Sequence, residues 1–268
     1  MTTILGTYDH YGYAAIALLG TFVGAWFLLW VTLRSPWADE LHTWRGVSPP
    51  FLGVVGVLFA LTLAFLANDT WNAHDRALNA VYQEADGLRS IDALAEHLPA
   101  PIKARVVGAV RDYARITVTE EWPLLARRQN SRAASDQLDR LLSLLAGPDV
   151  SAVAPTGVHG LMLSQAVQVR AARGLRIALS QTHVNPLKWL GMAFLGFLTM
   201  ISIAMVHVDQ GRAEILAMVI FAAAAAPTAA IVLVQGNPFQ QPTVVHAGPI
   251  AALAAEPGAQ SSGAGGAR

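Results

Sequence analysis

Several side chains that bind metals or transfer protons lie in one stretch of the sequence. They are His74, Asp75, Glu84, Asp86, Asp92 and His97. They form no HExxH motif or other compact ligand set, so their spacing does not indicate a metal site. On an amphipathic helix such groups are typical of a solvated face. We therefore expect no bound metal and no other cofactor.

Motifs for nucleophilic or nucleotide-dependent catalysis are also missing from the sequence. Ser, His and Asp are present, but there is no GxSxG, no phosphate-binding loop and no dinucleotide-binding fingerprint. The chain has no cysteine, which excludes disulfides and thiolate chemistry. We expect that the protein is not an enzyme.

The composition is that of a membrane protein. Hydrophobic residues make up 54% of the chain and charged residues 13%, against about 45–50% and about 25% in soluble domains. Lys plus Arg and Asp plus Glu number 18 each, so nothing favours nucleic-acid binding. The first 13 residues contain no Lys or Arg, so we expect no cleaved signal peptide.

Four apolar runs have the length of membrane spans. The first, residues 13–33, has 21 residues without a charge, which is about 31 Å of helix and matches a bilayer core. The others are residues 51–67, 187–208 and 215–234. We predict an all-α fold with four transmembrane helices.

The runs divide the chain into four regions. Residues 1–67 hold spans 1 and 2, residues 68–186 form a helical domain, residues 187–235 hold spans 3 and 4, and residues 236–268 form a largely disordered tail. Four spans place both termini and the domain on one side of the membrane. Because the domain holds most of the Lys and Arg, we predict an inner-membrane, multi-pass protein with cytoplasmic termini and a cytoplasmic domain.

Proline and glycine residues mark the ends of the predicted helices in the domain. We expect helices at residues 68–97, 101–122, 133–146 and 158–183, with Pro123 ending the second. No alternation typical of strands occurs.

The junction after the second span contains no helix breaker. Asn68 and Asp69 have the chemistry of a new helix cap, or they form the first polar turn of one unbroken helix. We favour an unbroken helix from residue 51 to about residue 97, about 70 Å long. Its predicted buried seam has heptad-like spacing: Trp71, His74, Leu78, Val81, Ala85 and Leu88.

An ordered series of motifs resembles the bestrophin-like domain family of bacterial membrane proteins and, more distantly, the bestrophin ion channels. The resemblance covers residues 51–239. Its residues are Trp71, Glu84 with Ala85, Tyr113, the triplet Glu121, Trp122 and Pro123, then Arg170, Arg173 with Gly174 and Leu175, Pro186, Trp189, and Pro238 with Phe239. The sequence departs from the family at Gln240, where glycine is common.

The resemblance implies a homo-oligomer, a pentamer in bestrophins, that conducts inorganic ions through a pore lined by the second span. The pore-lining candidates are Gly53, Val57, Ala60, Leu61 and Ala64. Aligning Trp71 with the matching bestrophin residue places Val57 and Leu61 near a hydrophobic neck, which gates by dewetting. Close helix packing is the alternative explanation of the small residues, and contact with lipid or with the protein core is that of the bulky ones.

The same motifs suggest an ion pair. We expect Glu84 to pair with Arg170 or Arg173, because an unpaired buried charge is costly. Separate solvated charges and an ion-binding ring at Glu84 are the alternatives.

The leading functional hypothesis is a bestrophin-like ion channel in the lipid bilayer. The alternative is a membrane-anchored interaction or sensory module without a pore, and a third is a membrane enzyme. The surroundings of the small face of the second span, water or another helix, distinguish the first two hypotheses.

Overall fold

The computed structural model describes residues 9–43, 49–181, 185–241 and 244–255. All regular structure in these residues is helical, which confirms the predicted all-α class. The helices are α2 (Asp9–Arg34), α3 (Ala38–Thr43), α4 (Pro49–Ala95), α5 (Ala100–Ile116), the π-helix η1 (Thr117–Glu121), α6 (Trp122–Leu125), α7 (Arg132–Ala146), α8 (Pro148–Ser151), α9 (Thr156–Ser180), α10 (Pro186–His207), α11 (Gly211–Val234) and α12 (Gly248–Ala255).

The chain divides into two compact units. The membrane unit contains α2, α3, the first part of α4, α10 and α11, and the helical unit contains the rest of α4, α5 to α9 and α12. Residue 73 ends the first part of α4, and residue 74 begins the second. The predicted limits at residues 68 and 186 refer to the membrane boundary, which these units do not define, so they remain predictions.

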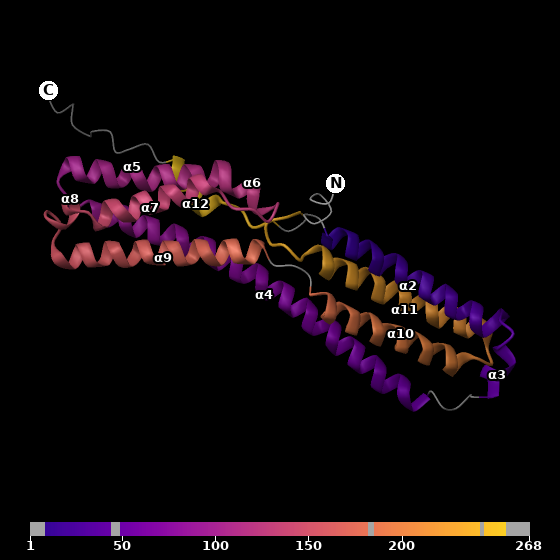
Figure 1. The fold of residues 1–268 in the computed structure, drawn as a ribbon. Coiled ribbons are helices and arrows are strands. Elements are labelled where there is room, and N and C mark those ends of the chain that lie inside the picture. The colour runs from indigo at the N-terminus through magenta and orange to yellow at the C-terminus, as the bar shows by residue number, and fades with distance from the viewer. Residues whose placement is uncertain (1–8, 44–48, 182–184, 242–243, 256–268) are drawn as a thin grey trace, which may run out of the picture. The chain divides into compact units, whose positions relative to one another are not determined.

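Helices of the membrane unit pack through apolar side chains. α2 lies along α11, and α10 packs against both (Figure 1). Methionines and alanines dominate one buried cluster, which includes Ala25, Met200, Ala204, Met218 and Ala222. Among the described residues, four helices are long and apolar enough to cross a membrane, and each contains or overlaps one of the predicted runs: Tyr11–Arg34, Phe51–Ala95, Pro186–His207 and Gly211–Val234.

Helix α4 is continuous through the polar junction, as predicted. It runs for 47 residues from Pro49 to Ala95. The hydroxyl of Thr70 donates to the carbonyl of Leu66 at 3.0 Å, so this polar side chain is satisfied within the helix. Asp69 forms an ion pair with Lys188 at 2.8 Å and so binds a neighbouring helix of the membrane unit.

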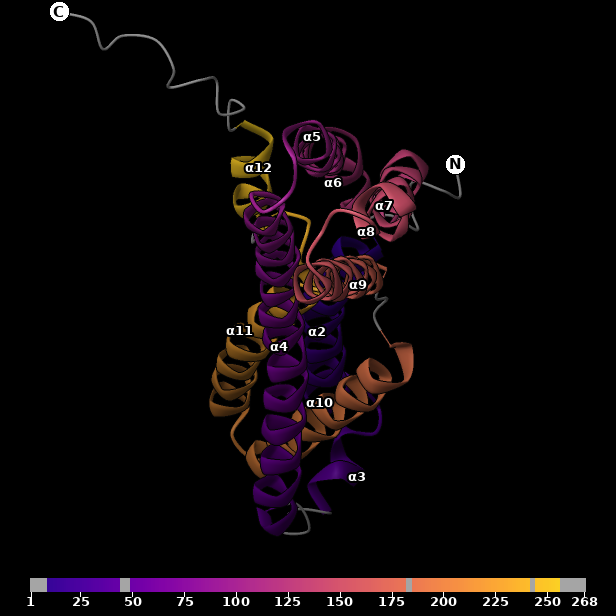
Figure 2. The same cartoon turned by 90° about the vertical axis from the view of Figure 1, so that its left-hand side faces the viewer.

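The second part of α4 buries one side in the helical unit. α5 packs on α7, α7 on α9 and α12 on α5, as the end-on view shows (Figure 2). A Cβ atom on Gly87 of α4 would lie 2.7 Å from Val169 of α9, so the two helices approach closely where α4 has no side chain. The buried positions of α4 include Ala77, Val81, Ala85, Leu88 and Ile91.

Pro123 does not end its helix, contrary to the sequence-based prediction. α5 passes into the π-helical turn η1 and then into α6, which ends at Leu125. Pro123 is the second residue of α6, a first-turn position that proline tolerates, and it directly follows the π-helical turn.

Part of the C-terminal tail is ordered, so the prediction of a largely disordered tail is wrong for Gly248–Ala255. These residues form α12, in which Ile250 and Leu253 are buried. The composition of the tail did not predict this helix, because its two buried apolar residues lie among Gly and Ala. Residues 256–268 lie outside the described residues.

Candidate pore helix and the buried charge network beside it

Helix α4 leaves one face of its apolar part uncovered. All five predicted pore-lining residues, Gly53, Val57, Ala60, Leu61 and Ala64, are exposed in the single chain. Gly53, Val57, Ala60 and Ala64 are three or four residues apart and Leu61 is four after Val57, which puts all five on one side of the helix. The structure therefore brings these residues together, and their place in a pore stays a prediction.

The same face continues beyond the apolar part and becomes polar. The exposed residues at this spacing are Asn68, Asn72, Asp75, Asn79, Gln83 and Asp86. Because α4 is unbroken, its surface changes from small and apolar to amide- and carboxylate-bearing along one helix. None of these eleven positions carries a basic side chain, and exposed Arg76, seven residues before Gln83, borders the face.

On the opposite side of α4, Glu84 is fully buried in the helical unit. Arg176 of α9 binds it with two donors, Nε to Oε2 at 2.7 Å and Nη2 to Oε1 at 2.9 Å. The hydroxyl of Tyr113 on α5 donates to the same Oε1 at 2.6 Å. Three helices thus meet at one carboxylate.

A second buried carboxylate extends this network. Nη2 of Arg176 also donates to Oε1 of Glu121 at 2.9 Å, and Nε of Arg173 donates to that oxygen at 3.1 Å. Arg173 Nη2 further donates to the hydroxyl of Ser135 on α7 at 2.9 Å. We call Glu84, Tyr113, Glu121, Arg173 and Arg176 the charge network. Its two carboxylates and two guanidinium groups balance in formal charge.

Two members of the charge network have shifted pKa values, Arg176 and Tyr113. Burial by itself lowers the pKa of Arg176, but the negative charge of Glu84 and its hydrogen bonds outweigh this effect and raise the pKa above its usual value. Burial, followed by the charge of Glu84, raises the pKa of Tyr113 well above its usual value. Tyr113 therefore keeps its proton and remains a donor. The guanidinium carbon of Arg176 also lies 5.0 Å from the centre of the Trp122 ring, a cation–π contact.

The predicted partners of Glu84 are wrong, because Glu84 pairs with neither Arg170 nor Arg173. Arg170 is exposed and forms an ion pair with Asp139 on α7. Arg173 binds Glu121. Helix periodicity explains the outcome, because Arg173 and Arg176, three residues apart, share the buried side of α9 whereas Arg170 points outward.

Two features of the charge network were not predicted from the sequence: the membership of Arg176 and the ion pairs of Glu121. A signal existed for Arg176, because it falls on the apolar stripe of α9. The buried residues of that stripe are Met162, Ala166, Val169, Arg173, Arg176 and Ser180, spaced four, three, four, three and four apart. An arginine at such a position needs a buried partner.

Comparison with known proteins identifies the family. A model of the bestrophin-like domain matches residues 19–249. The chain belongs to the bestrophin-like domain family. It is a bestrophin-type membrane protein, and the recognition drawn from its motifs is confirmed. No curated protein matches the sequence.

Solved structures share the bestrophin fold with this chain. A variant of a bacterial bestrophin homologue from Klebsiella pneumoniae has a TM-score of 0.68 at 13% identity, covering 90% of this chain and 96% of that one. A second crystal structure of this homologue gives 0.65 at 14%, covering 90% and 94%. A variant described only as a membrane protein gives 0.66 at 14%, covering 90% and 96%. At these identities the similarity shows the fold alone.

Proposed function

We propose that this bestrophin-like protein is a homo-oligomeric ion channel whose conduit is lined by α4. The observation that carries the proposal is the unbroken helix with one uncovered face from Gly53 to Asp86. A pore wall needs such a face, because it meets water and ions instead of another helix of its own subunit. Cyclic symmetry closes identical subunits around an axis, and the family resemblance supports five of them.

Two parts of this face have different roles in the proposal. Val57 and Leu61, at 58% and 50% exposed, form a hydrophobic constriction that gates by dewetting. In this proposal residues 68–186, which include the polar part of α4, lie in the cytoplasm, as do both termini. The charge network fixes α4 in the helical unit from the side facing away from the conduit.

The carboxylates on this face favour cations over anions. Asp75 and Asp86 are exposed on it, and rings of acidic side chains attract cations in channels. We expect Asp75→Asn to reduce the preference for Na⁺ over Cl⁻, read as a shift of the reversal potential toward zero under a NaCl gradient. Asp112→Asn, at an exposed carboxylate on α5, is the matched control and should leave the reversal potential unchanged. A preference for Cl⁻ in the unmodified protein would contradict cation selection.

Ion flux through purified protein in liposomes tests the channel itself, with oligomer mass measured on the same sample. We expect flux from a ring-sized oligomer and a several-fold increase for Leu61→Ala, because a smaller side chain widens the constriction. Leu58→Ala is a closely matched control, since Leu58 is 48% exposed but lies on an adjacent side of α4. A stable monomer or dimer without flux of any common ion would overturn the proposal and favour an interaction module.

A further inference from the structure

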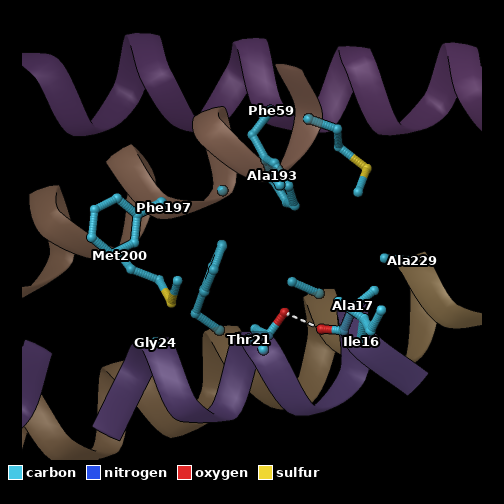
Figure 3. Close-up of a pocket in the computed structure, with 14 residues that line it drawn as sticks. Ile16, Ala17, Thr21, Gly24, Phe59, Ala193, Phe197, Met200 and Ala229 are labelled. Atoms are coloured by element: carbon cyan, nitrogen blue, oxygen red, sulfur yellow. Dashed lines mark hydrogen bonds between the residues drawn. The ribbon is translucent and has the colours of Figure 1, made fainter. Parts of the chain in front are cut away.

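A cavity of about 300 Å³ lies inside the membrane unit, among α2, α4, α10 and α11 (Figure 3). Its floor is buried and includes Met192 and Met200, each 5% exposed. Its mouth is open, because Ile16 and Phe197 also line it and are 68% and 37% exposed. The cavity therefore leads from the apolar surface of the spans into their interior.

The lining offers nothing to a polar ligand. None of the described residues that line the cavity is charged, and Thr21 supplies the one side-chain hydroxyl. That hydroxyl donates its hydrogen bond to the carbonyl of Ala17 at 2.7 Å, within α2 (Figure 3). A cavity with such walls stays dry and takes apolar molecules.

We propose that this cavity binds the hydrocarbon chain of a membrane lipid. All four surrounding helices are candidate membrane spans, so hydrocarbon chains surround the mouth. An uncharged wall without a free donor matches an uncharged chain. An apolar cavity of about 150 Å³ holds one benzene ring, so about 300 Å³ accommodates about a dozen carbon atoms, the scale of a lipid chain. Van der Waals contact supplies the attraction, because a chain that leaves the bilayer for the cavity gains little from the hydrophobic effect.

The occupant would contact the proposed pore helix, and this part of the inference rests on the proposed function. Phe59 of α4 lines the cavity and lies 5.6 Å, centre to centre, from the ring of Phe221 on α11. Along α4, Phe59 falls between Val57 and Leu61. A bound chain therefore supports the constriction from behind, and the composition of the bilayer becomes a regulator of the channel.

Photolabelling tests the site without relying on flux. The protein is placed in vesicles of phosphatidylethanolamine and phosphatidylglycerol that contain a lipid with a diazirine in its acyl chain, and adducts are mapped by peptide mass spectrometry. We expect adducts on Phe59 and Met200. Gly20→Leu should reduce them several-fold, because Gly20 lines the cavity and a Cβ there meets no atom within 4 Å, so a larger side chain enters the space.

Gly12→Leu is the matched control, because a Cβ at Gly12 on α2 also meets nothing within 4 Å and Gly12 does not line the cavity. Ala193→Leu fills the mouth from α10 and serves if Gly20→Leu does not fold. Equal labelling of all lipid-facing residues, unaffected by either filling variant, would overturn the site. So would absent labelling combined with a change of oligomer mass in Gly20→Leu, which would assign the cavity to a second copy of the chain. Specific labelling without flux would leave the site intact and remove the proposed function alone.

Discussion

The helices of the membrane unit meet through small and apolar side chains, whereas the helical unit buries two glutamates and two arginines at its centre. Among the described residues of the membrane unit, the buried charged side chain is Glu214, which lies in the first turn of α11 and accepts a hydrogen bond from Thr32. The difference follows from the surroundings. Helices inside a bilayer gain no hydrophobic stabilisation when they associate, because lipid tails are as apolar as their side chains. Close van der Waals packing therefore stabilises their contacts. In the helical unit, burial is favourable for apolar groups and costly for charges, so each buried charge must be matched.

The largest expected effect comes from removing Arg176. Arg176→Ala removes the guanidinium that binds Glu84 and one of the two that bind Glu121, so we expect the helical unit to lose about 3–5 kcal/mol of unfolding free energy. Hydrogen exchange of the amides in α5 and α9 measures this loss locally. The matched control is Arg170→Ala, which breaks an exposed ion pair worth at most about 1 kcal/mol. Equal effects of the two variants would contradict a central role for the charge network.

Removing the hydroxyl of Tyr113 should have a smaller effect. Tyr113→Phe deletes a hydrogen bond to a charged acceptor, which is worth about 1.5–3 kcal/mol. The same variant also tests how the stability of the helical unit depends on pH.

Because the pKa of Tyr113 is raised in the folded state, the contribution of Tyr113 to the free energy of unfolding is complete below the unfolded pKa of about 10 and is lost as pH rises above it. The unmodified helical unit should therefore lose about 1.4 kcal/mol per pH unit above pH 10 from this group, and Tyr113→Phe should lack that component. Identical alkaline slopes in both proteins would contradict the prediction.

The smallest predicted effects compare one substitution in the two units. Gly87→Ala places a Cβ 2.7 Å from Val169 and 3.4 Å from the carbonyl oxygen of Gln165, so we expect a loss of about 1–3 kcal/mol. Gly196→Ala places a Cβ 3.1 Å from the ring of Phe59, which borders the cavity and has room to move, so the loss should be smaller. Thermal unfolding measures both variants. Gly174→Ala on α9 is the control, since its Cβ meets nothing within 4 Å and alanine favours the helix. A larger loss for Gly196→Ala would reverse the comparison.

The sequence patterns predicted the helices more accurately than they predicted the contacts between them. The spans were predictable because each needs only length and lack of charge, and α4 because no proline interrupts it. The predicted seam of α4 was correct for Val81, Ala85 and Leu88, which are buried. It was wrong for Trp71, which is 58% exposed and donates its ring N–H to Gln235 at 3.2 Å. Periodicity alone does not predict the burial of Trp71, which lies where the membrane span passes into the helical unit. The buried side of α4 in the span and its buried side in the helical unit need not point in the same direction.

By itself, the sequence determined the all-α class, the four apolar spans, the continuity of α4 and, through ordered motifs, the family. These properties depend on neighbouring residues, on helix periodicity and on the presence or absence of breakers. The tertiary structure decided which arginine meets Glu84, how the tail folds into α12, and that a cavity remains among the spans. Partner choice between helices depends on their rotation and close approach, such as that of α4 and α9 at Gly87, and these are set by the packing of the whole unit. A shift of three residues along α9 exchanges Arg173 for Arg176, and only the assembled fold distinguishes them.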